Sequence, residues 1–298
     1  STIEGKIDTV GTVVDGIDTV VDRIEVDTTA IEVDTQAIEA DTQEIQSDTD
    51  TIIGTTSVTT TDNAHIKGTH TLAQLKAVND GTSGTITLDN YAVALTGSAS
   101  DLAAAFAGTF ASTYTGNLTI NDADATSIAA TVLSAIGSAT SGTVTVTNAI
   151  NITGTADEAV AALETSSSKV EVTDAVVTLS DDPDLTELGQ LNEATTGAIK
   201  INTRGKTYSG SASALATGLA GTVTDNAGNA LNGAMTVNDN PSTSVAATLL
   251  STIGGATTGT VTVSNAINIT GNTSQVKAAL VDAGTLVVAT SATVSISD

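Results

Sequence analysis

Residues 125–155 read ATSIAATVLSAIGSATSGTVTVTNAINITGT, and residues 242–272 read STSVAATLLSTIGGATTGTVTVSNAINITGN. The two segments lie 117 residues apart, and weaker copies begin at Thr71 and Leu185. The period is therefore about 58 residues, which is typical of proteins built from stacked repeats. We predict four repeats, with approximate bounds 69–126, 127–183, 184–243 and 244–298.

Each repeat divides into two halves, and each half combines a helical stretch with a strand. Leu72, Leu75 and Val78 have helical spacing, whereas Thr143–Val146 alternates as a strand does. The helical stretches of the second halves are 100–106, 156–163, 212–219 and 273–280, and their strands are 118–120, 170–172, 235–237 and 286–288. Eight units of about 28 residues result, none long enough to bury its own apolar face.

These units predict an α+β chain in which stacking builds a continuous core. A solenoid-like helix–strand array and a row of small α/β modules both fit this pattern. A shaft in which three chains share one core also remains open. A β-sandwich is disfavoured, because helical segments interrupt the pairs of strands. Aromatic residues make up only 2% of the chain, so the core must be thin and made of small side chains.

A different pattern occupies the first 53 residues. Apolar and β-branched side chains recur on two interleaved seven-residue series, at heptad positions d and a, which is typical of a coiled coil. This seam consists of Ile3, Ile7, Val10, Val14, Ile17, Val21, Ile24, Thr28, Ile31, Thr35, Ile38, Thr42, Ile45, Thr49 and Ile52. We predict a coiled-coil stem over 1–53, roughly 75–80 Å long at 1.5 Å per residue, followed by a Thr-rich neck over 54–68.

The stem predicts the oligomeric state. β-Branched residues at both a and d favour three or more strands over a dimer, so we expect a parallel homotrimer. Residues 1–53 contain fourteen acids and two bases, so facing helices bring acid against acid. Threonine replaces valine at position a from Thr28 onward, which makes the second half of the stem weaker than the first.

Charge and composition exclude several classes of partner. A net charge of −25 opposes binding to nucleic acid and to anionic membranes. There is no cysteine, so disulfides and thiolate metal sites are excluded. No secretory signal or apolar run of about 18 residues is present, so we expect neither targeting nor membrane insertion.

Few residues suggest chemistry. His65 and His70 flank Lys67 at the end of the predicted neck. A metal ring across three chains is one interpretation and a solvated neck the other. Acidic clusters recur at the junctions between repeats, where oxygen-rich turns can hold calcium. The candidate ligands are Asp122, Asp124, Asp181, Asp182, Asp184 and Asp239. They lack the spacing of a calcium loop, so plain turns are the alternative, and we predict no other cofactor and no catalytic residue.

The stem sequence KIDTVGTVVDGIDTVVDRIEVDTTAIEVDTQAIEADTQEIQSDTDTI resembles the Asp-Thr-rich coiled coils of bacteriophage structural proteins, especially tail fibres and appendages of marine and cyanobacterial phages. The repeat sequence TTGTVTVSNAINITG resembles repeats of long phage and bacterial surface adhesins. The resemblance implies a trimeric virion fibre that is anchored at one end. The repeats of this chain do not include a distinct aromatic-rich tip of the kind that receptor-binding fibres carry.

The leading hypothesis is therefore a non-enzymatic structural fibre of a phage particle. Other virion proteins would hold its N-terminal end, where the stem packs better. Two alternatives are an adhesin module whose repeats bind a host glycan or protein, and a subunit of a cell-surface layer or extracellular filament.

Overall fold

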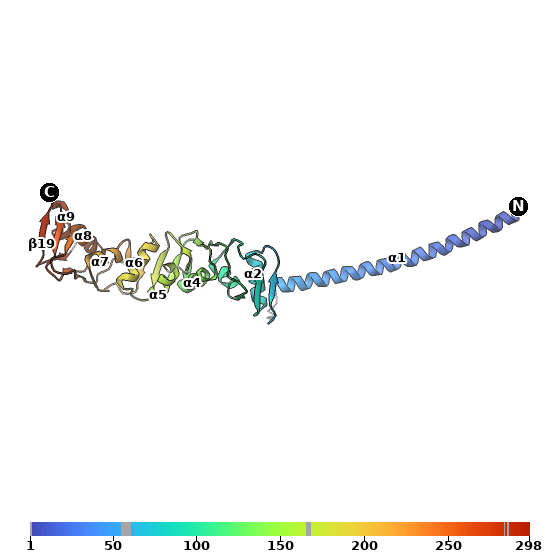
Figure 1. Cartoon of the computed structure of the whole chain (residues 1–298), viewed down its shortest axis with the longest axis horizontal. Helices are drawn as coiled ribbons and strands as arrows, with labels where there is room; N and C mark the ends of the chain where they lie inside the picture. Colours follow the sequence, from blue (N-terminus) through green and yellow to red (C-terminus); the bar gives the residue numbers. More distant parts are fainter. Residues whose placement is uncertain (1, 55–60, 165–167, 283, 285) are drawn as a thin grey trace. The chain divides into compact units, whose positions relative to one another are not determined.

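The computed structural model describes residues 2–54, 61–164, 168–282, 284 and 286–298, without the side chains of 39–54. The chain divides into two compact units, Ser1–Val58 and Thr59–Asp298. Each unit is described by itself, and Figure 1 shows the elements of both.

The first unit is one helix, α1 (Ile3–Gly54), of 52 residues. Its many Asp and Thr residues and its four glycines are poor helix formers. Every described side chain from Thr2 to Ile38 is exposed in the single chain. No intramolecular packing therefore supports this long helix along its described face.

The described part of the second unit contains eight further helices. They are α2 (Leu72–Gly81), α3 (Ala99–Ala105), α4 (Ala130–Ala139), α5 (Ala156–Leu163), α6 (Leu185–Ala194), α7 (Ala212–Gly218), α8 (Ala247–Gly255) and α9 (Thr273–Leu280). Most begin at a Ser, Thr, Asp or Asn whose side chain accepts a hydrogen bond from the first turn. Helices α4 and α8 instead follow directly from a strand and have no side-chain cap.

Short strands alternate with these helices. They are β1 (Ala64–Ile66), β2 (Thr85–Leu88), β3 (Leu95–Gly97), β4 (Thr109–Phe110), β5 (Leu118–Ile120), β6 (Ser127–Ala129), β7 (Val144–Val146), β8 (Asn151–Gly154), β9 (Val170–Glu171), β10 (Val176–Leu179), β11 (Ile199–Ile201), β12 (Tyr208–Gly210), β13 (Val223–Asp225), β14 (Met235–Val237), β15 (Ser244–Ala246), β16 (Val261–Val263), β17 (Asn268–Gly271), β18 (Val287–Val288) and β19 (Thr293–Ile296). Each pairs in parallel with strands that lie 22 to 27 residues away along the chain.

The strands form five parallel sheets, with orders β1-β2-β4, β3-β5-β7-β9, β6-β8-β10-β11-β13, β12-β14-β16-β18 and β15-β17-β19. Helices that are consecutive in sequence pack on one another, from α2 against α3 to α8 against α9. Figure 1 shows α2 to α9 following one another along the unit in sequence order. Each helix–strand unit thus buries its apolar face against the units before and after it.

The order of elements from α2 to β10 recurs without change from α6 to β19. Three strands separate α3 from α4 and α7 from α8, whereas two separate the other consecutive helices from α2 onward. Beside the extra strand the pairing shifts by one place, so that β5, the second strand of its unit, pairs with β7, the first strand of the next. The same kind of shift occurs between β10 and β11. The 58-residue repeats therefore alternate between two kinds.

The core consists of aliphatic side chains from both element types. Leu75, Leu133, Leu188 and Leu250 are fully buried at equivalent places on α2, α4, α6 and α8. Alternate strand residues, such as Val144 on β7 and Val261 on β16, are buried in the same cluster. This thin aliphatic core agrees with the composition.

The mixed α/β character, the long N-terminal helix and the repeated helix–strand units are confirmed. The helical stretches predicted at 156–163 and 273–280 match α5 and α9, and the strand predicted at 118–120 matches β5. The sequence did not reveal β4, β6, β13 or β15, which have two or three residues each. The last residues of the predicted neck form β1, which pairs with β2.

Candidate functional site

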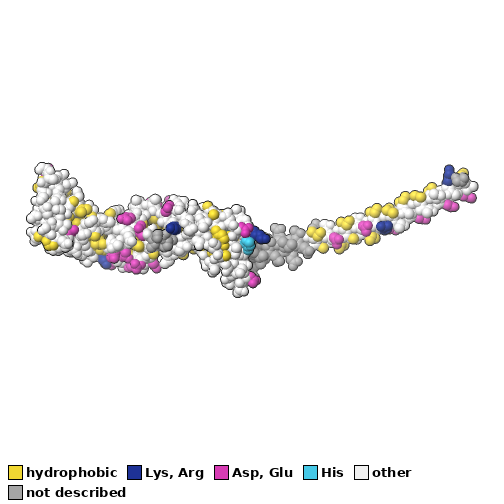
Figure 2. Space-filling model, in the orientation of Figure 1, with side chains coloured by type: hydrophobic (Ala, Val, Ile, Leu, Met, Phe, Trp, Pro, Cys, Tyr) yellow, Lys and Arg dark blue, Asp and Glu magenta, His cyan; other side chains and the backbone are white. Residues whose placement is uncertain are grey.

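The described side chains of α1, from Ile3 to Ile38, are left uncovered in the single chain. The isoleucines and valines of the predicted seam, as far as Ile38, range from 45% exposed at Val21 to 80% exposed at Ile3. Figure 2 shows hydrophobic side chains following one edge of this helix, with acidic side chains along another. The last four predicted seam residues, Thr42, Ile45, Thr49 and Ile52, lie outside the described side chains.

The seam threonines are bonded within their own helix. Thr28 Oγ1 donates to the Ile24 carbonyl oxygen at 2.7 Å, and Thr35 Oγ1 donates to the Ile31 carbonyl oxygen at the same distance. A hydroxyl bonded in this way needs no partner from a neighbouring helix. Its methyl group can then pack in the seam beside the isoleucines.

Three of the candidate calcium ligands cap helices of the preceding unit. The N–H of Ala99, the first residue of α3, donates to Asp122 Oδ2 at 2.7 Å. Equivalent bonds run from Ala156 N to Asp181 Oδ1 at 2.9 Å, from Ala212 N to Asp239 Oδ2 at 2.7 Å and from Thr273 N to Asp298 Oδ1 at 3.0 Å. The first amides of a helix lack intrahelical partners and attract negative charge, so each aspartate fastens one unit to the unit before it.

The remaining acidic candidates also accept bonds from backbone amides. Asp124 Oδ1 accepts from Ala149 N at 3.1 Å, and Asp182 Oδ1 accepts from Thr203 N at 2.7 Å. Asp184 is the N-cap of α6 and accepts from two amides of its first turn. Within the described ranges, no three His, Asp or Glu side chains converge in a way that could hold a metal ion.

Threonines that follow α2, α4, α6 and α8 also link neighbouring units. Thr140, after α4, donates from Oγ1 to the Gly116 carbonyl oxygen at 2.8 Å, and its Oγ1 accepts from Gly142 N at 2.9 Å. A Cβ at Gly142 would lie 2.7 Å from that same carbonyl oxygen, which is why the position requires glycine. Equivalent bonds are made by Thr82, Thr195 and Thr257.

These four sites share the sequence Thr-[Ser/Thr]-Gly, which is the signal that would have identified them. Each threonine follows a helix of the same kind, α2, α4, α6 or α8. The buried hydroxyl is what joins the turn to the preceding unit.

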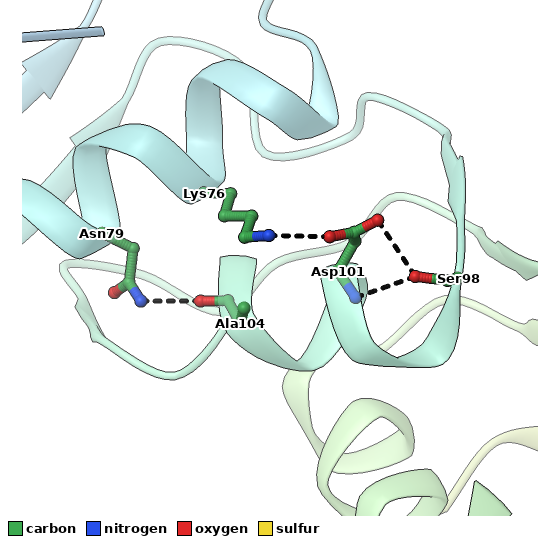
Figure 3. Close-up of polar contacts among 5 residues, drawn as sticks. All are labelled: Lys76, Asn79, Ser98, Asp101 and Ala104. Atoms are coloured by element: carbon green, nitrogen blue, oxygen red, sulfur yellow. Dashed lines mark hydrogen bonds and ion pairs between the residues drawn. The ribbon is translucent and has the colours of Figure 1, made fainter. Parts of the chain in front are cut away.

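Side chains also connect neighbouring helices. Lys76 on α2 forms an ion pair with Asp101 on α3, at 2.7 Å between Nζ and Oδ1 (Figure 3). Asn79 Nδ2 donates to the Ala104 carbonyl oxygen at 2.7 Å. The hydrogen bond from Lys76 holds the pKa of Asp101 below its usual value, and Ser98 Oγ adds a second bond to the same carboxylate. Both charged groups remain partly exposed, so the pair orients α2 on α3 more than it stabilises them.

The two histidines have different surroundings. His65 Nε2 lies 2.7 Å from Asp89 Oδ1 at the surface, whereas His70 is only 4% exposed. Tyr114 donates to the Val93 carbonyl oxygen at 2.6 Å, so His70 Nε2–H must donate to Tyr114 Oη, at 3.2 Å. His70 Nδ1 is then a buried acceptor without a partner. Burial lowers the pKa of His70 and raises that of Tyr114 to about 12.

Three of the aromatic residues, Phe106, Phe110 and Tyr114, pack together with His70. The ring of Phe106 lies edge-on to Tyr114, with 4.8 Å between centroids, and also contacts Phe110 at 5.6 Å. His70 meets Tyr114 from another side, at 6.0 Å. This cluster fills the core near β4.

None of the described helices is both long and apolar enough to cross a membrane. Comparison of the chain with protein families, with curated proteins and with solved structures found no match.

Proposed function

We propose that the chain is a non-enzymatic structural fibre or appendage protein of a phage particle, which assembles as a parallel trimer through α1. The observation that carries this proposal is the row of exposed isoleucine and valine along α1, interrupted in the described part of the seam only by Thr28 and Thr35. A helix with so many poor helix formers is not stable without tertiary contacts. Copies of the same helix, aligned in parallel, cover that row with an identical one.

The energetics favour association. Full burial of an isoleucine or valine side chain is worth about 1.5–3 kcal/mol, and nine such side chains lie in the described part of the seam. Acid-against-acid contacts at the flanks oppose association, and salt reduces this repulsion. β-Branched residues at both seam positions favour three helices over two.

The second unit supplies length in this proposal. Its helix–strand units form a solenoid, joined by parallel ladders, by aspartate caps and by the Thr-[Ser/Thr]-Gly turns. All of these contacts join neighbouring units, so the unit can extend without a large central core. The stem then sets the number of chains, and the solenoid sets their reach from the virion.

The test is the mass of the full chain in solution, measured by sedimentation equilibrium. We expect three times 29.4 kDa. Replacing Ile31 and Ile38 by alanine should give monomers, because both lie in the seam. Replacing Val26 and Val33 by alanine, at the outward heptad position f of the same segment, is the matched control and should leave the trimer intact. If the trimer survives the isoleucine replacements, the contact between chains must lie in the second unit.

A second candidate, an adhesin that binds a host glycan, rests on the outward hydroxyl groups of the sheets. Thr96, Thr119 and Thr145 are in register on β3, β5 and β7, and Ser209, Thr236 and Thr262 are equivalent on β12, β14 and β16. Regular rows of hydroxyls can hydrogen-bond a polysaccharide. Binding to host envelopes that is lost when Thr119 and Thr145 become valine would favour this function, and unchanged binding would contradict it.

A further inference from the structure

Two exposed valines of α1 lie beside the seam rather than in it. Val13 is 56% exposed and Val20 is 51% exposed, and both occupy heptad position g, next to a seam residue at a. In the following heptads the same position holds Asp27 and Asp34. The apolar face is therefore wider in the first half of α1 than in the second.

A wider face indicates an additional neighbour. A stripe restricted to a and d is sufficient for a coiled coil, whereas a stripe that includes g is typical of helices that face the broader core of a bundle or globular protein. In a parallel coil, position g faces position e of the adjacent helix five residues further on. Val13 then faces Asp18 of the adjacent copy, and Val20 faces its Glu25. A hydrated carboxylate does not cover a valine, so the trimer leaves these valines at its surface.

We propose that the valine flank, defined as Val13 and Val20 with Asp18 and Glu25 of the adjacent copy, is a docking surface for a basic amphipathic helix of a different protein. The inference rests on the proposed trimer and names the chemistry of the partner that holds its N-terminal half. Apolar side chains of that helix cover the valines, and its Lys or Arg residues pair with the carboxylates.

The charge of the stem decides which occupant fits. The first 27 residues contain seven acids and two bases. A further copy of the same helix would add more acids to an already acidic surface, whereas a basic segment neutralises it. Asp27 and Asp34, which hold position g in the following heptads and are also exposed, offer no apolar flank there. Docking is therefore confined to the first half.

The test uses the full chain and a synthetic probe. The probe is a helical peptide of about 21 residues with leucine along one face and lysine on both sides of it, and its control has the same composition with the leucines dispersed. Binding is followed by fluorescence anisotropy at about 0.15 M salt, where long-range attraction is screened beyond roughly 8 Å. Wild-type protein should bind the probe and should bind the control peptide much more weakly.

The deciding variant combines Val13→Asp with Val20→Asp. It places aspartate at position g in the first half of the stem, as Asp27 and Asp34 do in the following heptads. Docking predicts at least about tenfold weaker binding, because the apolar contacts are lost. Non-specific attraction predicts the reverse, because the variant has two more acids per chain. The matched control is Val26→Asp with Val33→Asp, which adds the same charge at position f and should bind the probe as the wild type does.

Several results would overturn the inference. These are absence of probe binding to the wild type, equal binding of both peptides, and undiminished binding to the Val13/Val20 variant. If that variant loses the trimer, the valines belong to the seam. If the wild type is larger than a trimer and the variant is not, the flank joins copies of this chain. If the wild type is not a trimer but binds the probe through Val13 and Val20, the proposed trimer is contradicted. The docking surface is still supported in that case.

Discussion

Replacing Asp122 by alanine distinguishes a helix cap from a calcium ligand. In the structure, Asp122 Oδ2 accepts the N–H of Ala99, the first residue of α3, at 2.7 Å. The alanine variant leaves that amide without its partner and removes a negative charge from the helix N-terminus. The same change at Asp239 removes the equivalent bond to Ala212.

The expected cost follows from these two losses. A side-chain cap is worth about 1 kcal/mol, and a charge near a helix N-terminus adds about 0.3–1 kcal/mol. Ser98 still caps α3 through the Asp101 amide, so the helix should persist. We expect Asp122→Ala to destabilise the local structure by about 1–2 kcal/mol and Asp122→Asn, which retains an acceptor oxygen, by about half as much.

Native-state hydrogen exchange at the Ala99 amide measures this effect locally. A loss of about 1.4 kcal/mol corresponds to a tenfold faster exchange, if exchange occurs through local opening. Asp174→Ala is the control, because its side chain is exposed and accepts no hydrogen bond within the described residues. Calcium should change neither protein. The capping argument is refuted if calcium slows exchange in the wild type and this effect disappears in both Asp122 variants.

Three further predictions concern other parts of the chain. Thr140→Val should destabilise the second unit by about 1–3 kcal/mol in urea unfolding, because it leaves the buried Gly116 carbonyl and the partly buried Gly142 amide without partners. Thr145→Val, on an exposed strand position, should change stability by less than about 0.5 kcal/mol. The pKa of His70 is lowered by burial, so the unfolded chain takes up a proton first and stability should fall as the pH drops below about 6.5; His70→Phe should flatten this dependence between pH 7.5 and 5.5. The helicity of a peptide spanning 1–54 should melt at higher temperature when salt is added or the pH is lowered, because either change relieves carboxylate repulsion, and a melting point indifferent to both would contradict the acid-against-acid contacts.

The sequence predicts the helices of the second unit well because each carries local signals. Thr155 and Glu158 form a capping box at α5, and Asn272 with Gln275 forms one at α9. The spacing of the leucines then marks the buried face. Such signals lie within one turn of the chain, so one sequence is enough to read them.

The short strands were missed for the opposite reason. β4 has two residues and β6 has three, which is too few for an alternating pattern to stand out. Their existence depends on parallel partners in neighbouring units, β2 for β4 and β8 for β6. The left-handed backbone of Ala125 just before β6, with φ of 59°, also has no signature in an alanine.

The candidate site likewise combines a feature with a local sequence signal and features that depend on distant partners. The seam could be read directly, because a heptad pattern states which residues share a face. The role of the acidic clusters could not be predicted from the sequence, because the amide that donates a hydrogen bond to Asp122 lies 23 residues earlier in the chain. Their spacing was nevertheless informative, since Asp122, Asp181, Asp239 and Asp298 recur once in each repeat.

The two units therefore depend on different partners for their stability. In the second unit, strands pair with strands 22 to 27 residues away, and the aspartate and threonine bonds span similar distances. Its stability should grow with the number of repeats and should not depend on protein concentration. The exposed seam of α1 gains its contacts only from other chains, so its helicity should rise with concentration. When the full chain is diluted, the helix signal of α1 should therefore decrease, while the protection of amides in the parallel ladders against exchange stays constant. Simultaneous loss of both would mean that the second unit also requires the oligomer.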